Sequence, residues 1–146
     1  MIVVDASVAA KWFLPEKGSS AALALQEGPS QLAAPDLIRM EVAAAITKRV
    51  RAENEKDRLP PEEAIERCGK WFRRLDQGIL VLVPEHELLG EAIKLSVDCK
   101  HSLQDCLYLA AARHLAAPLV TADEPFHRRI KSYYKKISLL EGCETN

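Results

Sequence analysis

The sequence predicts a single α/β domain in which helices sandwich a parallel β-sheet. Short apolar runs alternate with long amphipathic patterns along the chain, and this alternation is typical of parallel-sheet proteins. The runs are continuous and rich in leucine or β-branched residues, as expected of strands that are buried on both faces. At 146 residues, the chain is long enough for one such domain with a substantial core, and we expect residues 1–146 to form it.

Five apolar runs are expected to form strands, and each is short. Four of them are dominated by isoleucine, valine and leucine, whereas the run at 31–33 has the weakest pattern. Strands buried in a parallel sheet have this composition. The predicted strands cover residues 2–4, 31–33, 79–83, 119–121 and 137–140.

Seven amphipathic patterns between these runs are expected to form helices. They cover residues 8–14, 20–26, 37–52, 61–76, 87–97, 103–115 and 125–132. The charged stretch 48–63 is expected to join two of them into a projecting hairpin, unless it is only a solvated helix end. The helix starts carry ordinary signals, namely possible caps at Asp36, Ser102 and Asp123 and first-turn prolines at Pro61 and Pro125.

The composition limits the kinds of partner and the compartment. Lysine and arginine number 20 and aspartate and glutamate 21, so the net charge is −1 and nucleic-acid binding would depend on local basic patches. No run reaches the ~20 apolar residues of a membrane span, and no export signal precedes the first strand. We therefore expect a cytoplasmic protein with reduced cysteines at Cys68, Cys99, Cys106 and Cys143.

Four acidic residues stand within or beside apolar runs, and two of them directly follow predicted strands. Asp5 follows the run 2–4, and Asp123 follows 119–121 after one intervening residue. Ligands of parallel sheets bind at the carboxyl ends of strands, and neighbouring strands are ~4.8 Å apart. If these two strands are adjacent, both carboxylates can reach one ion. Alternatively, each aspartate only caps the helix that follows it.

Glu41 and Asp105, the other two acids, lie on predicted helices. Glu41 is spaced three and four residues from apolar neighbours on both sides, which places it at the margin of the apolar stripe. A carboxylate there needs a partner unless it extends to water. Asp105 follows Ser102 by three residues, which resembles a capping box. That role is compatible with a helix N-terminus facing the same crevice.

Two hydroxyl residues lie near the strand-end aspartates. Ser7 is two residues after Asp5, and Thr121 is two residues before Asp123. Either hydroxyl can orient a carboxylate or a bound water. The simpler alternatives are a helix cap for Ser7 and an ordinary strand position for Thr121.

Convergence of the four acids would imply a bound cation. Two like charges ~4 Å apart repel by roughly 4 kcal/mol at an effective dielectric near 20, so clustered carboxylates need a cation or raised pKa values. Oxygen ligands favour magnesium or manganese over zinc. The histidines show no metal-ligand spacing and are interpreted as surface or core residues; they are His86, His101, His114 and His127.

Several segments together resemble the PIN-domain nucleases, and within them the VapC-type toxins of bacterial and archaeal toxin–antitoxin pairs. These segments are residues 3–9, 11–16, 34–41, 105–110 and 117–126, and they span nearly the whole chain in the order and spacing of the family. Any one segment is weak evidence, but the set is specific. Gln104 and Cys106 depart from the usual residues beside the third acid, and neither change removes a ligand.

The resemblance implies a three-layer α/β/α sandwich with sheet order 3-2-1-4-5 and a magnesium-dependent endoribonuclease, with manganese as a possible substitute. In that chemistry a metal-activated water attacks a phosphodiester in line. The family pattern assigns Ser7 and Thr121 as accessory hydroxyls. It assigns the catalytic and metal-binding acids to Asp5, Glu41, Asp105 and Asp123.

The same resemblance implies an RNA substrate, an antitoxin protein as partner and a homodimer, without any membrane association. Candidate phosphate contacts are basic residues near the predicted site, although each could simply be solvated surface. They are Lys11, Lys48, Arg49, Arg128 and Arg129 within the basic run 127–131. Near the hairpin, Ile65, Trp71 and Phe72 could dock another chain.

Three alternative functions make different demands on the sequence. A phosphoacceptor receiver domain would need an acidic pair after the first strand and a lysine after the last strand, but Asp5 stands alone and Glu141 follows the last run. A housekeeping RNA-processing nuclease of the same fold would have the same acids and differ only in its cellular role. A silent binding module is disfavoured by the complete acidic set.

Overall fold

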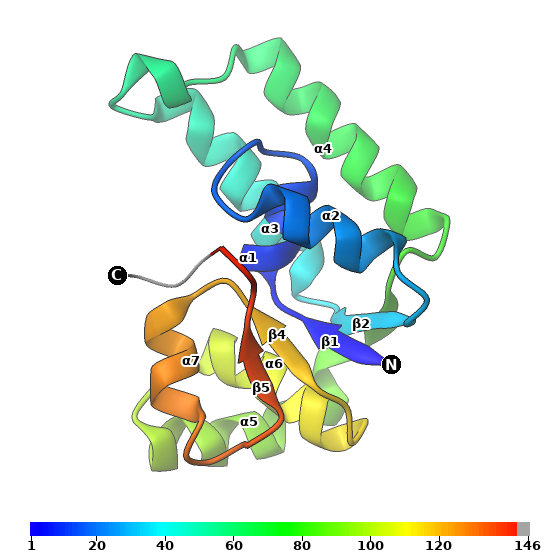
Figure 1. The fold of residues 1–146 in the computed structure, drawn as a ribbon, viewed down its shortest axis with the longest axis vertical. Coiled ribbons are helices and arrows are strands. Elements are labelled where there is room, and N and C mark those ends of the chain that lie inside the picture. The colour runs from blue at the N-terminus through cyan, green and yellow to red at the C-terminus, as the bar shows by residue number, and fades with distance from the viewer. Residues whose placement is uncertain (143–146) are drawn as a thin grey trace.

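The computed structural model describes residues 1–142, in which helices surround a five-stranded parallel sheet (Figure 1). The strand order is β3-β2-β1-β4-β5, and every neighbouring pair is parallel. The fold class and strand order predicted from the sequence are therefore confirmed. The strands are β1 (Ile2–Val4), β2 (Leu32–Pro35), β3 (Val81–Val83), β4 (Leu119–Thr121) and β5 (Ile137–Leu139).

All seven predicted helices are present within the described residues, with shifts at their ends. Short 3₁₀ turns extend or join some of them. The α-helices are α1 (Ala6–Ala9), α2 (Ser19–Glu27), α3 (Ile38–Lys48), α4 (Pro61–Asp76), α5 (Glu85–Cys99), α6 (Leu103–His114) and α7 (Glu124–Ile130), and the 3₁₀ turns are η1 (Ala10–Trp12), η2 (Arg49–Arg51) and η3 (Glu55–Asp57).

Two predicted helix starts differ from the structure for identifiable reasons. The first helix begins at Ala6 rather than at residue 8, because the Asp5 side chain caps it by accepting a hydrogen bond from the Val8 N–H. The predicted cap at Asp36 is wrong. Helix α3 begins one residue later, and Asp36 instead accepts a hydrogen bond from the Arg39 guanidinium at 2.8 Å.

Helix α6 lies at the centre of the molecule, between the sheet and α5. It contacts β1, β2 and β4 on one side and packs extensively against α5 on the other. Its residues 106–112 are all buried, as expected of a helix that is enclosed on every side. Alanines at 110–112 let the neighbouring elements approach closely. This buried helix therefore fixes the position of its own N-terminus at the edge of the sheet.

Helices α3 and α4 extend beyond the sheet as the predicted hairpin, with η2 and η3 at its tip (Figure 1). Trp71 of α4 does not face a partner, and that expectation is wrong. It is fully buried, its ring contacts Trp12 at a tilt and Phe13 edge-on, and its indole N–H donates to the Arg39 carbonyl at 3.1 Å. Ile65 is 73% exposed on the same helix.

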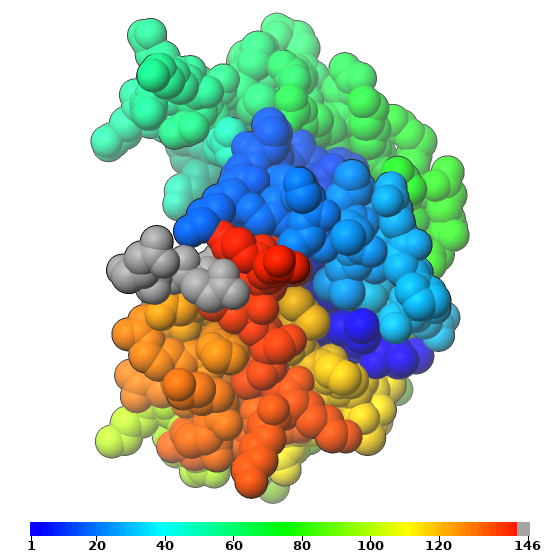
Figure 2. All heavy atoms as spheres, in the orientation of Figure 1, coloured from blue at the N-terminus to red at the C-terminus, as the bar shows by residue number. Residues whose placement is uncertain are grey.

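The face shown in Figure 2 carries β5, and Glu141 and Gly142 after it line a cavity together with Gly18 and Ser19 at the start of α2. No helix within residues 1–142 is both long and apolar enough to span a bilayer. Cys68, Cys99 and Cys106 are free cysteines within the described residues. Cys143 lies outside the described residues.

Candidate functional site

Each of the four predicted acids lies at the N-terminal end of a helix that starts at the carboxyl edge of the sheet. Asp5 and Asp123 are the N-cap residues of α1 and α7, and Glu41 and Asp105 lie in the first turns of α3 and α6. Helix N-termini carry partial positive charge and favour carboxylates nearby. The capping alternative therefore holds for both aspartates, and it coexists with a shared location for the four acids.

Asp5 is the most deeply placed of these acids, with an exposed fraction of 4%. Its Oδ1 accepts hydrogen bonds from the Ser7 hydroxyl at 2.5 Å and the Val8 N–H at 3.3 Å, and its Oδ2 accepts one from the Thr121 hydroxyl at 2.5 Å. Burial raises the pKa of Asp5 to about 6, although both hydroxyl bonds lower it, and the charge of Asp105 raises it further.

The two hydroxyls tie the end of β1 to the turn between β4 and α7. Ser7 Oγ accepts a hydrogen bond from the Ala122 N–H at 2.9 Å, and Thr121 Oγ1 accepts one from the Asp123 N–H at 3.0 Å. Each hydroxyl thus donates to Asp5 and accepts from the turn. Ser7 is not the cap of α1, which is Asp5, and Thr121 does hold an ordinary strand position as the last residue of β4. Both hydroxyls nevertheless orient the Asp5 carboxylate.

Glu41 is held by a donor from another helix. Its Oε1 accepts a hydrogen bond from the Tyr108 hydroxyl of α6 at 2.7 Å. Burial raises the pKa of Glu41, the bond from Tyr108 lowers it, and the charge of Asp105 raises it. The Glu41 carboxylate therefore has a hydrogen-bond partner within the chain, as expected for a charged group at the margin of the apolar stripe.

Asp105 is held by a histidine one turn earlier in the chain. The His101 Nε2 lies 2.6 Å from Asp105 Oδ2, and the imidazole stacks on Phe126 with ring centroids 5.0 Å apart. The predicted capping box is half present: the Ser102 hydroxyl accepts from the Asp105 N–H at 3.3 Å. The Asp105 carboxylate is bonded to His101 instead of turning back toward the Ser102 N–H.

Asp123 is joined to the other acids through Thr121 and not by its own carboxylate. Its Oδ1 accepts a hydrogen bond from the Phe126 N–H at 3.1 Å, which caps α7. The charge of Asp105 raises the pKa of Asp5 and of Glu41, whereas Asp123 is not among the causes of either shift. Three acids are thus electrostatically coupled, and the fourth lies beside them across the β4 turn.

The chemistry of the donors fits a hard divalent cation. The groups that meet here are carboxylate and hydroxyl oxygens, which are the ligands of magnesium and manganese. A buried carboxylate with a raised pKa is also a place where a cation would favour the ionised form. As the side chains stand in residues 1–142, no three acids, histidines or cysteines are close enough to hold one ion.

The basic residues proposed to contact phosphate are already engaged in part. The Lys11 ammonium lies 3.3 Å from Glu16, and the Arg128 guanidinium lies 3.5 Å from Glu124. Arg128 and Arg129 line a surface cavity of about 510 Å³ along α7, the helix that Asp123 caps.

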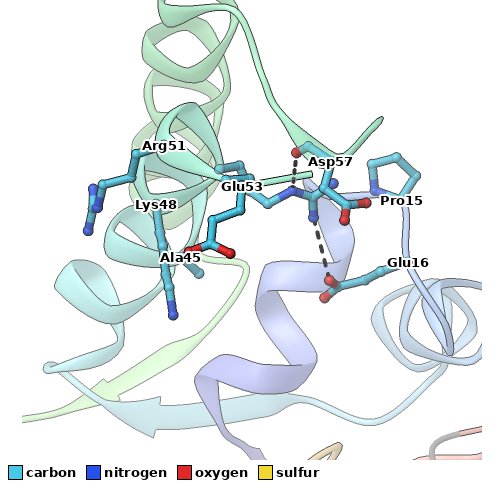
Figure 3. Close-up of a pocket in the computed structure, with 9 residues that line it drawn as sticks. Pro15, Glu16, Ala45, Lys48, Arg51, Glu53 and Asp57 are labelled. Atoms are coloured by element: carbon cyan, nitrogen blue, oxygen red, sulfur yellow. Dashed lines mark hydrogen bonds and ion pairs between the residues drawn. The ribbon is translucent and has the colours of Figure 1, made fainter. Parts of the chain in front are cut away.

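A larger cavity of about 710 Å³ lies between the loop after η1 and the end of α3 (Figure 3). Its lining includes Lys48 and Arg49 but none of the four acids. Arg49 is held in place by Glu16 at 3.7 Å and by the Asp57 carbonyl at 2.6 Å. Ala45, which lines the cavity, lies one turn along α3 from Glu41. The cavity is therefore separate from the four acids.

Sequence reasoning missed two residues of the site, Tyr108 and His101. Tyr108 lies three residues after Asp105, and His101 lies four residues before it. For Tyr108, which lies on α6 with Asp105, this spacing places both side chains on the same face of the helix and was the available signal; His101 precedes the N-cap of α6, so the helical spacing does not apply to it. His101 was interpreted as an ordinary surface or core histidine, but it forms a hydrogen bond to one of the candidate ligands.

Comparisons with known proteins agree with this geometry. A family model described as PIN domain matches residues 2–131. A toxin–antitoxin complex from Klebsiella pneumoniae superposes with a TM-score of 0.65 at 16% identity, covering 94% of this chain and 96% of that chain. FitAcB from Neisseria gonorrhoeae superposes with a TM-score of 0.53 at 13% identity, covering 99% of this chain and all of that chain. At these identities the likeness shows a shared fold. None of the curated proteins compared matches the sequence.

The raised pKa of Asp5 predicts a pH-dependent loss of stability in the metal-free protein. Between 3.8, the ordinary value, and about 6, the folded chain keeps a proton that the unfolded chain has released, so the free energy of unfolding falls as pH rises through this window. The loss amounts to roughly 3 kcal/mol above the window. Asp5→Asn should remove it, because an amide does not titrate.

Urea denaturation of the metal-free proteins at pH 4 and pH 7.5 measures this effect. The stability of Asp5→Asn relative to the parent should be greater at pH 7.5 than at pH 4. If the stability difference between the variant and the parent is the same at both pH values, Asp5 ionises in the folded state without a cost in stability.

Proposed function

The chain belongs to the PIN domain family, and from this we propose that it is a divalent-metal-dependent endoribonuclease that serves as the toxin of a toxin–antitoxin pair. The family consists of nucleases in general. RNA as the substrate, magnesium or manganese as the cofactor and the toxin role belong to the proposal.

One observation carries the catalytic part of the proposal. Carboxylates from three separate elements lie at the carboxyl edge of the sheet, and the charge of Asp105 raises the pKa of both Asp5 and Glu41. Such a group is unfavourable for a purely structural purpose, because like charges repel. It is favourable where a cation must be bound and then used.

The proposed metal ligands are Asp5, Glu41, Asp105 and Asp123. Magnesium bound among them would supply an activated water and neutralise charge on the phosphate oxygens. The protein contributes orientation: Ser7 and Thr121 fix both oxygens of Asp5. Lys11, Arg128 and Arg129 are the proposed contacts to the RNA backbone, where cations favour phosphate.

The toxin role is supported by the structures that share this fold. One of them is a toxin–antitoxin complex, and its superposition on this protein covers almost the whole length of both chains. We therefore propose an antitoxin protein as the partner, a homodimer as the assembly and the cytoplasm as the compartment. The exposed Ile65 and Phe72 on α4 offer apolar contacts for a partner.

Replacing a single ligand should abolish RNA cleavage without unfolding the protein. Asp5→Asn and Asp123→Asn keep the size of each side chain but remove a charge from the ion site. We expect cleavage of single-stranded RNA in magnesium to fall at least ~100-fold in each variant. Asp36→Asn is the matched control, because Asp36 also follows a strand at this edge but pairs with Arg39.

The control should cleave RNA like the parent, and circular dichroism should show that all three variants are folded. Cleavage by Asp5→Asn at the rate of the parent would mean that the catalytic group lies elsewhere.

Expression of the parent chain alone should stop the growth of a bacterial host, because an unrestrained endoribonuclease depletes RNA. Asp5→Asn, expressed to the same soluble level, should permit growth. Colony counts and optical density after induction measure growth with the parent and with the variant. Normal growth with the soluble, RNA-cleaving parent would favour a housekeeping nuclease over a toxin.

A further inference from the structure

Tyr108 connects the centre of the molecule to Glu41, one of the four candidate ligands. The tyrosine is 1% exposed on α6, and its hydroxyl donates to Glu41 Oε1 on α3 at 2.7 Å. Within residues 1–142 this is the only hydrogen bond recorded for the Glu41 carboxylate. The other two coupled acids have their own donors, so Glu41 alone depends on a phenol from the core.

The direction of this hydrogen bond is fixed. The Tyr108 hydroxyl is the donor and the Glu41 carboxylate is the acceptor, because an ionised carboxylate has no proton to donate. A buried hydroxyl also needs an acceptor, and Glu41 is the acceptor that the structure provides. The carboxylate thus gives the buried hydroxyl its acceptor, and the hydroxyl gives the carboxylate its donor.

The bond opposes a force that would move Glu41 out of the site. Glu41 is partly exposed, and the like charge of Asp105 repels it. A glutamate has three side-chain torsions, so an untethered Glu41 could turn toward water and away from Asp105. Ser7 and Thr121 do not restrain it, because their hydroxyls donate to Asp5.

We propose that Tyr108 is a positioning residue that holds the Glu41 carboxylate in the acidic site, with Oε1 bound to the phenol and Oε2 left for the cation. The inference rests on the proposed function, in which Glu41 is a metal ligand. Tyr108 does not touch substrate or metal. It acts through Glu41, as partners of metal ligands commonly do when they fix ligand orientation.

Binding of Mn²⁺ to the purified chain without RNA tests this role directly. Tyr108→Phe keeps the buried ring and removes only the hydroxyl. We expect its Mn²⁺ dissociation constant, measured by electron paramagnetic resonance, to rise roughly 10-fold or more. RNA cleavage at limiting magnesium should fall in parallel and recover as magnesium is raised.

Tyr134→Phe is the matched control for loss of a phenol. The Tyr134 hydroxyl donates to the Ala117 carbonyl at 2.5 Å, near the other end of α6 from the acids. This variant should lose thermal stability but bind Mn²⁺ like the parent. In a Glu41→Gln background, Tyr108→Phe should change Mn²⁺ affinity by less than about twofold, because residues that act through one contact are not additive.

Two outcomes would overturn the inference. One is a Tyr108→Phe protein that binds Mn²⁺ as tightly as the parent, which would reduce the tyrosine to a packing role. The other is a full effect of Tyr108→Phe in the Glu41→Gln background. A parent that binds Mn²⁺ and loses affinity on Tyr108→Phe, yet never cleaves RNA, would support the inference and contradict the proposed function.

Discussion

The candidate site depends on the mutual repulsion of carboxylates gathered at one edge of the sheet. Asp105 disfavours the charge on both Asp5 and Glu41, and two unit charges ~4 Å apart repel by roughly 4 kcal/mol at an effective dielectric of 20. Each acid is therefore restrained by its own donor. Hydroxyls hold Asp5, the Tyr108 phenol holds Glu41, and an imidazole holds Asp105. The remaining repulsion is what a divalent cation would relieve.

The fold supplies the positions that this constraint requires. Parallel strands end at one edge, and the helices that follow or precede them begin there, so four helix N-termini meet around the acids. Their partial positive charge favours carboxylates. Helix α6 is enclosed between the sheet and α5, which gives Asp105 and Tyr108 a rigid support. Glu41, Asp105 and Tyr108 therefore lie on helices, and Asp5 and Asp123 lie in the short turns that join strands to helices.

The helices and strands could be predicted from the sequence because apolar periodicity is a local signal, and the strand order and the set of acids could be predicted because they are implied by the family resemblance. The contacts of the acids could not. Whether Tyr108 meets Glu41 depends on how α6 crosses α3, 67 residues away in sequence, and no pattern records that crossing. Trp71 was misjudged for the same reason, since its burial depends on Trp12 and Phe13 from the first helical segment.

The central claim is that the acids form a site for a divalent cation, and a thermal melt of the parent protein in magnesium tests it most directly. A cation that binds only the folded state adds about 2.7 kcal/mol at ~100 times its dissociation constant. At ~2–4 °C per kcal/mol, the melting temperature should rise by about 5–10 °C, well beyond the effect of sodium at equal ionic strength. No divalent-specific shift up to tens of millimolar magnesium would contradict the account.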